Sequence, residues 1–219
     1  MRIAIIGAGN IGGNLTRRLT ALGHDVAVAN SRGPETLADL ATETGATPVT
    51  FTDAPRGADI LIVTIPQKAV PGLPKDLLKD LPEGAIVIDT GNYYPKERDG
   101  LIAEIEGGTT ESRWVADQLG HPVVKVFNGI YAANLLARFR PAGAPDRLAL
   151  PIAGDDDAAK KVVADLVDEL GFDPVDAGSL DESWRQQPAT PVYGLDAGVD
   201  GVRAALAAAS PDRSAAFTA

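Results

Sequence analysis

The stretch "RIAIIGAGNIGG", residues 2–13, joins a continuous apolar run to regularly spaced glycines. An apolar run that ends in glycine is typical of a strand buried on both faces of a parallel sheet. The residues that follow the run carry apolar side chains at the helical period: Ile11, Leu15, Leu19 and Leu22. The stretch therefore predicts a strand, a tight turn and a helix, in that order.

The glycines of this stretch have the spacing G-x-G-x-x-G, formed by Gly7, Gly9 and Gly12. Each position has a physical task in a dinucleotide site, namely the tight turn, the approach of the pyrophosphate and the close packing of helix on strand. The helix that begins here also directs unpaired N–H groups and its positive dipole end at the phosphates. The context between a strand and a helix makes the motif a specific prediction of dinucleotide binding.

The second predicted strand, residues 25–30, ends where NAD enzymes usually carry a carboxylate for the ribose diol. Here the chain reads "NSRGPETL", residues 30–37. Asn30 is uncharged, Ser31 can donate a hydrogen bond, and Arg32 can form a charge-assisted pair with phosphate oxygens. The segment therefore predicts a preference for NADP. The alternative is that Arg32 is a solvated arginine of a surface loop.

Strands and helices alternate through the rest of the chain. Further strands are expected at residues 47–50, 58–65, 85–90, 122–128, 148–154 and 172–177, and further helices at 34–45, 72–80, 111–119, 130–138, 156–170 and 199–210. Such alternation predicts an α/β fold with a doubly wound, mostly parallel, Rossmann-type sheet. We expect residues 1–178 to form the nucleotide-binding domain. Residues 179–219 are expected to be a C-terminal extension packed on it, with a mobile tail.

Ligands of open α/β sheets bind beyond the carboxyl ends of the strands. This rule selects Thr64, Ile65, Pro66 and Gln67 after one strand, Thr90–Asn92 after the next, and Asn128 after a third. Thr64, Ile65 and Pro66 are expected to line the dinucleotide near its ribose or nicotinamide. Asn128 suits the nicotinamide amide or a substrate carbonyl, and the alternative is that it caps the following helix.

Few residues present themselves for acid–base chemistry. His24 and His121 precede strands and are expected at the opposite edge. Tyr93, Tyr94 and Trp184 are either aromatic walls for a flat substrate or packing residues, and Lys125, inside a strand, receives no role. With no catalytic triad, acidic dyad or Walker lysine, no catalytic side chain is identified. The reaction favoured is hydride transfer between molecules held face to face.

Composition narrows the class of partner. A net charge of −10 argues against a nucleic-acid surface, and the absence of 18 consecutive apolar residues argues against a membrane span. Zero cysteines and only two histidines exclude disulfides and make a metal site improbable. No signal peptide is visible at the amino terminus, so a cytoplasmic location is expected.

Four segments together resemble the reductases that exchange hydride between NADPH and the deazaflavin coenzyme F420: residues 3–37, "ILIVTIPQKAV" (60–70), "VIDTGNYY" (87–94) and "KVFNGIYAANLL" (125–136). The broader group includes the NADP-binding domain of membrane ferric reductases and the amino-terminal domains of 3-hydroxyacid dehydrogenases. The resemblance covers about residues 1–175, and it assigns no role to residues 91–114 or 180–195.

This resemblance implies a compact domain, a homodimer, and a deazaflavin ring stacked on the nicotinamide above the sheet. It implies that the diphosphate is held by Gly7, Gly9, Asn10, Ile11 and Gly12. Ser31 and Arg32 would then hold the 2′-phosphate, Ile65 and Pro66 would lie along the cofactor, and Asn128 would lie near the nicotinamide.

Three functions follow as hypotheses. The first is an NADP(H)-dependent oxidoreductase whose hydride acceptor is a deazaflavin such as coenzyme F420, or a flavin. The second is reduction of a small carbonyl or imine, for which the sequence offers four proton donors: Lys68, Tyr93, Tyr94 and Tyr131. The third is a non-catalytic NADP-sensing module.

Overall fold

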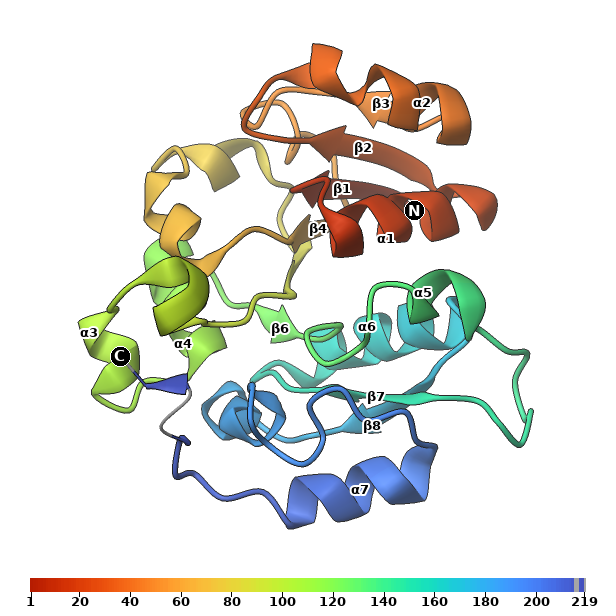
Figure 1. The fold of residues 1–219 in the computed structure, drawn as a ribbon. Helices are drawn as coiled ribbons and strands as arrows, with labels where there is room; N and C mark the ends of the chain where they lie inside the picture. Colours follow the sequence, from red (N-terminus) through yellow and green to blue (C-terminus); the bar gives the residue numbers. More distant parts are fainter. Residues whose placement is uncertain (215–216, 219) are drawn as a thin grey trace.

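Six parallel strands form the central sheet of this computed structural model, which describes residues 1–214 and 217–218. The spatial order is β3-β2-β1-β4-β5-β6 (Figure 1). The strands are β1 (Arg2–Ile6), β2 (Asp25–Ala29), β3 (Thr47–Pro48), β4 (Ile60–Val63), β5 (Ile86–Asp89) and β6 (Val124–Lys125). The order reverses between β1 and β4, the position at which doubly wound sheets bind dinucleotides. The predicted α/β class and Rossmann-type sheet are confirmed.

The core lies on both faces of this sheet, because successive side chains of a strand point to opposite sides. Ile3 and Ile5 of β1 pack in one cluster with residues of α1 (Asn10–Ala21) and α6 (Asp157–Glu169). Ala4 and Ile6 pack in the other, which includes residues of α4 (Glu111–Leu119). Burial on both faces explains why β1 reads as a continuous apolar run.

The remaining helices are α2 (Ala38–Thr44), which follows a 3₁₀ turn at Pro34–Leu37, α3 (Ala103–Glu106), α5 (Asn134–Ala137) and α7 (Val199–Ala207). Two helices begin at side-chain caps: Thr110 accepts from the N–H of Arg113, and Asp156 accepts from the first turn of α6. The helix expected at 72–80 is wrong. The chain forms 3₁₀ turns at Gln67–Gly72 and Leu77–Asp80. Pro71 within the first turn and Pro74 between the two lack the N–H that an α-helix needs.

The strand expected at 122–128 is shorter than predicted. β6 ends at Lys125, and Phe127 has a φ of 64°. Positive φ is rare for an aromatic residue and cannot continue a strand. The helix expected at 130–138 is likewise reduced to the four residues of α5.

The last two strands, β7 (Ala149–Ile152) and β8 (Asp173–Asp176), pair in parallel as a second, two-stranded sheet. It meets the main sheet through an antiparallel bridge between Lys125 and Ala153. Figure 1 shows this sheet between the main sheet and α7, and Val202 and Leu206 of α7 share a cluster with Val175 of β8. The expectation of one mostly parallel sheet therefore holds only through β6.

The C-terminal segment forms a 3₁₀ stretch at Leu180–Gln186 and then α7, after which the chain returns to α3 and α4 (Figure 1). There Arg213 lies 3.1 Å from a carboxylate oxygen of Glu111. The predicted domain boundary at residue 178 stays a prediction. So does the expected mobility of the tail, and part of that tail, residues 215–216 and 219, lies outside the described residues. Every helix among residues 1–214 and 217–218 is too short or too polar to span a bilayer.

Candidate functional site

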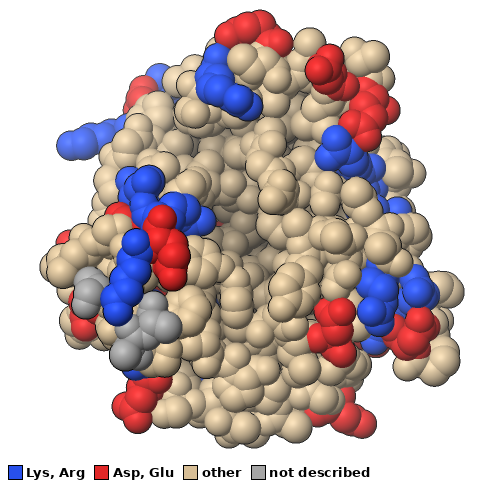
Figure 2. All heavy atoms as spheres, viewed as in Figure 1, with Lys and Arg blue, Asp and Glu red and all other residues tan. Residues whose placement is uncertain are grey.

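Two adjoining hollows lie along the carboxyl edge of the main sheet. One, of about 490 Å³, extends toward the end of β2, and the other, of about 480 Å³, extends toward the ends of β5 and β6. They share Gly9, Thr64, Ile65 and Pro66. Figure 2 shows the molecule hollowed near the middle of this face, with mostly uncharged residues around the hollow. We call the two parts the adenosine hollow and the nicotinamide hollow, after the halves of the dinucleotide that the sequence predicts there.

The glycine turn separates the two hollows, and its glycines differ in their surroundings. Gly7 has a φ of 108°, and a Cβ on Gly12 would lie 1.8 Å from the carbonyl oxygen of Gly7. A Cβ on Gly9 would meet nothing within 4 Å. Gly7 and Gly12 thus allow the turn to form and α1 to pack closely, whereas Gly9 leaves an open backbone face toward the cleft. These are the separate tasks that the motif assigns to its glycines.

The adenosine hollow ends at the predicted NADP segment, with Asn30, Ser31 and Arg32 among its lining residues. The side chain of Asn30 shapes this loop: its Oδ1 accepts from the N–H of Arg32 at 2.9 Å, and its Nδ2 donates to Thr36 Oγ1 at 2.9 Å. Arg32 is exposed, and its guanidinium makes no hydrogen bond or ion pair to the residues that the structure describes. Its donors therefore remain available for an anion beside the hydroxyl of Ser31.

The residues predicted to bind the cofactor lie around the cleft. All of them line one or both hollows except Gly12, which lies beneath the turn. Asn10, Ile11 and Asn128 line the nicotinamide hollow, together with Thr90, Gly91 and Asn92 from the loop after β5. The topology therefore brings together residues that follow five strands, namely β1, β2, β4, β5 and β6. Their contact with a dinucleotide stays a prediction.

Asn128 is buried, and its amide is already engaged. Its Nδ2 donates to Asn92 Oδ1 at 3.0 Å and to the carbonyl oxygen of Gln186 at 2.6 Å. Its Oδ1 accepts from Gln186 Nε2 at 3.0 Å. Asn128 does not cap α5, whose N-cap residue is Ala133. The side chain therefore ties the loops after β5 and β6 to the C-terminal segment, and one Oδ1 lone pair remains for a ligand.

Three tyrosines line the nicotinamide hollow: Tyr94, Tyr131 and Tyr193. The hydroxyls of Tyr94 and Tyr193 are hydrogen-bonded to each other, and the guanidinium of Arg98 lies 4.9 Å from the centre of the Tyr94 ring. Burial, followed by the bond to Tyr193, raises the pKa of Tyr94, so that its hydroxyl stays protonated at neutral pH. Sequence reasoning missed Tyr193, which lies 99 residues from Tyr94 in a segment without a recognisable motif.

Other residues singled out from the sequence lie away from the cleft. Tyr93 is buried in the core, where its hydroxyl accepts from the N–H of Ile102 and burial raises its pKa. Trp184 and Lys68 are not among the lining residues of either hollow. The structure therefore removes Tyr93 and Lys68 as proton donors for this cleft, and Tyr93 and Trp184 as aromatic walls.

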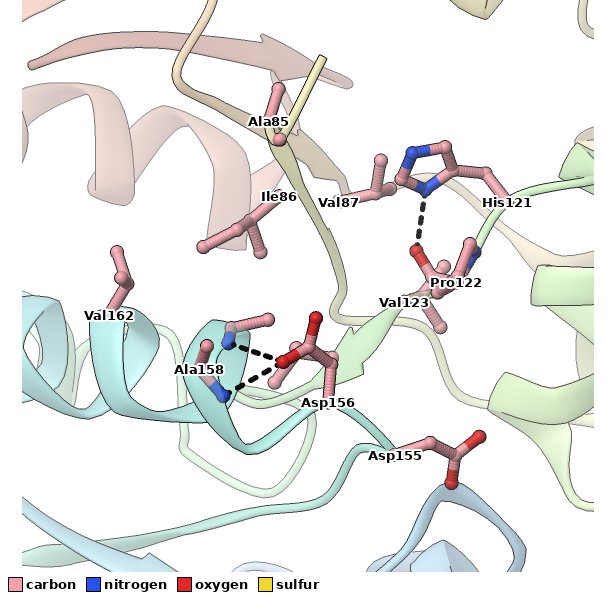
Figure 3. Close-up of a pocket in the computed structure, with 13 residues that line it drawn as sticks. Ala85, Ile86, Val87, His121, Pro122, Val123, Asp155, Asp156, Ala158 and Val162 are labelled. Carbon is pink, nitrogen blue, oxygen red and sulfur yellow. Dashed lines mark hydrogen bonds between the residues drawn. The ribbon is translucent and has the colours of Figure 1, made fainter.

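The two histidines lie at the amino ends of strands, as expected. His24 precedes β2 and lies 3.2 Å from a carboxylate oxygen of Glu169. His121 lines a separate hollow at the amino ends of β5 and β6, shown in Figure 3, where its Nδ1 lies 2.7 Å from the carbonyl oxygen of Pro122. The same hollow is bordered by Asp156, whose carboxylate caps α6. This third hollow is therefore separated from the cleft by the length of the strands.

Beneath the nicotinamide hollow lies a buried group of charged residues. Lys125 is fully buried, and its ammonium donates to Gly91 O at 3.1 Å and to Ser112 Oγ at 3.0 Å. The Ser112 hydroxyl donates to Asp89 Oδ2 at 2.6 Å. Glu111 lies 3.8 Å from the ammonium, and burial raises its pKa to about 7. The sequence did not predict this group. Lys125 stands alone in an apolar run, and nothing in the spacing of the residues indicates which side chains surround it.

Comparison with known proteins gives a family model that matches the sequence and solved structures with a similar fold. The sequence model of the family described as "NADP oxidoreductase coenzyme F420-dependent" matches residues 2–93. The solved structure of a hypothetical protein from Sinorhizobium meliloti is 32% identical, with a TM-score of 0.76, and the match covers 91% of this chain and 96% of that one. A "putative F420 dependent NADP-reductase" from Arthrobacter sp. FB24 is 24% identical, with a TM-score of 0.67 over 82% of this chain and 85% of that one. At 24% identity, the match to the Arthrobacter protein shows only that the two chains share a fold.

Curated relatives are matched over part of their length. Metalloreductase STEAP3 of Rattus norvegicus is 31% identical over 193 residues, which are 87% of this chain and 36% of that protein. Protein YjhV of Escherichia coli is 55% identical over 56 residues, which are 26% of this chain and 41% of that protein. The chain thus spans less than half of the length of the curated relatives it matches.

Proposed function

Because the chain belongs to the family of NADP oxidoreductases described as coenzyme F420-dependent, we propose that it transfers a hydride between NADPH and a deazaflavin or flavin. The residues present fit the dinucleotide. Gly9 and the start of α1 would hold the diphosphate, Ser31 and Arg32 the 2′-phosphate, and Ile65 and Pro66 the central part of the cofactor. When bound, NADPH supplies the hydride, and the protein supplies its position relative to the acceptor.

The observation that carries this proposal is the continuity of the two hollows across Thr64, Ile65 and Pro66. At one end the guanidinium of Arg32 makes no pair with a described residue. At the other end, aromatic side chains and backbone surround a space of about 480 Å³. Pockets of this size accept a flat ring and bury most of its surface. A ring lying against the nicotinamide there would receive the hydride directly, with no covalent intermediate between protein and acceptor.

A second function, reduction of a carbonyl or imine, is favoured by the hydrogen-bonded pair Tyr94 and Tyr193. A hydroxyl that stays protonated at neutral pH can donate a proton to the alkoxide or amide anion that hydride transfer would produce, and its raised pKa makes it a weaker acid than an ordinary tyrosine. A deazaflavin or flavin does not need a proton donor at the ring atom that accepts the hydride. The pair therefore discriminates between the two enzymatic hypotheses.

The test is to mix the purified protein and NADPH separately with coenzyme F420, FMN, FAD and a panel of carbonyls and imines. The loss of the deazaflavin's visible absorbance, dependent on protein and NADPH, is the expected result. Turnover of carbonyls or imines alone would support the second function. NADPH binding without turnover of any acceptor would contradict both and favour the NADP-sensing module. The homodimer and the cytoplasmic location expected from the sequence stay predictions.

A further inference from the structure

We propose that Asp89 and Lys125 are positioning residues for the acceptor half of the cleft, acting on the backbone of Gly91 from beneath. The inference rests on the proposed function, because its readout is hydride transfer. Gly91 and Asn92 line the nicotinamide hollow, whereas Asp89 and Lys125 do not. The two residues therefore do not touch a ligand in the hollow, and we expect them to act through the loop that they hold.

The register of the sheet places the two residues together. Asp89 ends β5 and pairs with Lys125 of β6, so both stand at the carboxyl edge on neighbouring strands. Asp89 Oδ1 accepts from the N–H of Gly91 at 2.8 Å, and the ammonium of Lys125 donates to the carbonyl oxygen of Gly91 at 3.1 Å. Both polar backbone groups of Gly91 are thus bonded to side chains that are themselves buried. Ser112 joins those side chains to each other, since its hydroxyl bonds to both.

The position of Gly91 leaves little room for movement. A Cβ there would lie 2.8 Å from Gln67 Oε1 and 2.9 Å from Asp89 Oδ1. Gln67 follows directly after Pro66, one of the residues that line both hollows. Gly91 therefore lies in close contact with the turn after β4 on one side and with Asp89 on the other.

The fixed loop continues into the wall of the hollow. Asn92 donates from Nδ2 to the carbonyl oxygen of Asn128 at 2.9 Å and accepts from Asn128 Nδ2 at 3.0 Å. Asn128 is bonded in turn to Gln186 of the C-terminal segment. A displacement of Gly91 would therefore move the residues that surround the predicted nicotinamide and its acceptor.

The burial of Lys125 is costly, which argues against packing as its only role. A fully buried ammonium is destabilising unless its partners compensate for its lost hydration, so packing alone would not require a charged side chain at this position. Here all the strong bonds of the ammonium go to Gly91 and to the Ser112 hydroxyl. Positions of reacting groups need to be kept within fractions of an ångström, and an error of about 1 Å can lower a rate about a hundredfold.

The experiment compares Lys125→Met with Arg147→Met in the full chain. Arg147 is the matched control: it is also a buried cation, 4% exposed, but it pairs with Asp168 and Asp173 and lines neither hollow. NADPH affinity, kcat and KM for the acceptor, and the thermal unfolding midpoint are measured for both. We expect both variants to be less stable. Only Lys125→Met should lower kcat, by on the order of tenfold to a hundredfold, with the Kd of NADPH changed by less than about twofold.

The outcomes separate the two proposals. Absence of hydride transfer in the wild-type protein would contradict the proposed function. A folded Lys125→Met protein with wild-type kcat, or an equal loss of kcat in Arg147→Met, would overturn the positioning role alone. Should Lys125→Met fail to fold, Ser112→Ala takes its place, because it breaks the link between Lys125 and Asp89 with a smaller change. Faster hydrogen exchange in residues 89–92 with a lower kcat would support the role, and wild-type values of both would overturn it.

Discussion

Replacement of Arg32 by alanine is expected to weaken the binding of NADPH and to leave the binding of NADH nearly unchanged. In the free protein the guanidinium of Arg32 has no partner among the described residues, so its removal breaks no internal bond. The backbone N–H of Arg32 still donates to Asn30 Oδ1, and that bond survives truncation of the side chain. The variant should therefore keep its loop and its thermal unfolding midpoint.

The magnitude follows from the kind of bond that is lost. A hydrogen bond to a charged group contributes about 1.5–3 kcal/mol, and 1.4 kcal/mol corresponds to a factor of ten in Kd. The Kd of NADPH should thus rise roughly 10- to 150-fold. The predicted ion pair between Arg32 and the 2′-phosphate is exposed to solvent. The rise in the Kd of NADPH should therefore be larger at low ionic strength and should decrease as salt is added.

Isothermal titration of the wild-type and variant proteins with NADPH and with NADH measures both effects directly. Arg56→Ala is the control, because Arg56 is another exposed arginine but lies in the loop that leads into the amino end of β4. An equal loss of affinity for the two dinucleotides would refute the role of Arg32 at the 2′-phosphate. Tighter binding of NADH than NADPH by the wild-type protein would refute the NADP preference itself.

Three further predictions concern other parts of the cleft and its surroundings. Gly9→Ala should fold normally and lose affinity for the dinucleotide, because a Cβ there meets no protein atom within 4 Å. Gly12→Ala should lower the thermal unfolding midpoint, because its Cβ would lie 1.8 Å from a backbone oxygen. Equal unfolding midpoints of the two variants would contradict this difference. Burial raises the pKa of Glu111 from 4.5 to about 7, so the folded state binds the extra proton and the free energy of unfolding should fall as pH rises between these values. Glu111→Gln should flatten that fall in urea titrations, and an unchanged pH profile would exclude Glu111 as its source. Tyr193→Phe removes the hydroxyl that bonds to Tyr94 and should change deazaflavin reduction by less than about threefold; a loss of about a hundredfold with a carbonyl substrate would indicate a proton-donating role.

The sequence by itself determined the local parts of this protein. The apolar run of β1, the glycine turn and the start of α1 are consecutive in the chain, so their geometry follows from neighbouring residues. The same holds for Asn30, Ser31 and Arg32, which follow β2 directly and reach the cleft because every parallel strand ends at the same edge. Topology and residue type together were sufficient to predict that these residues lie around one cleft, and their contact with a dinucleotide stays a prediction.

Tertiary structure decided the surroundings of the nicotinamide hollow. Tyr193 reaches Tyr94 across 99 residues, Gln186 reaches Asn128 across 58, and Lys125 reaches Gly91 across 34. None of these contacts has a spacing that a helix or strand repeats, and each depends on how loops and the C-terminal segment pack. Lys125 is the clearest case. A lysine within an apolar run has no evident role in the sequence, and only the folded chain supplies its buried partners, which are the carbonyl oxygen of Gly91, the hydroxyl of Ser112 and the carboxylate of Glu111.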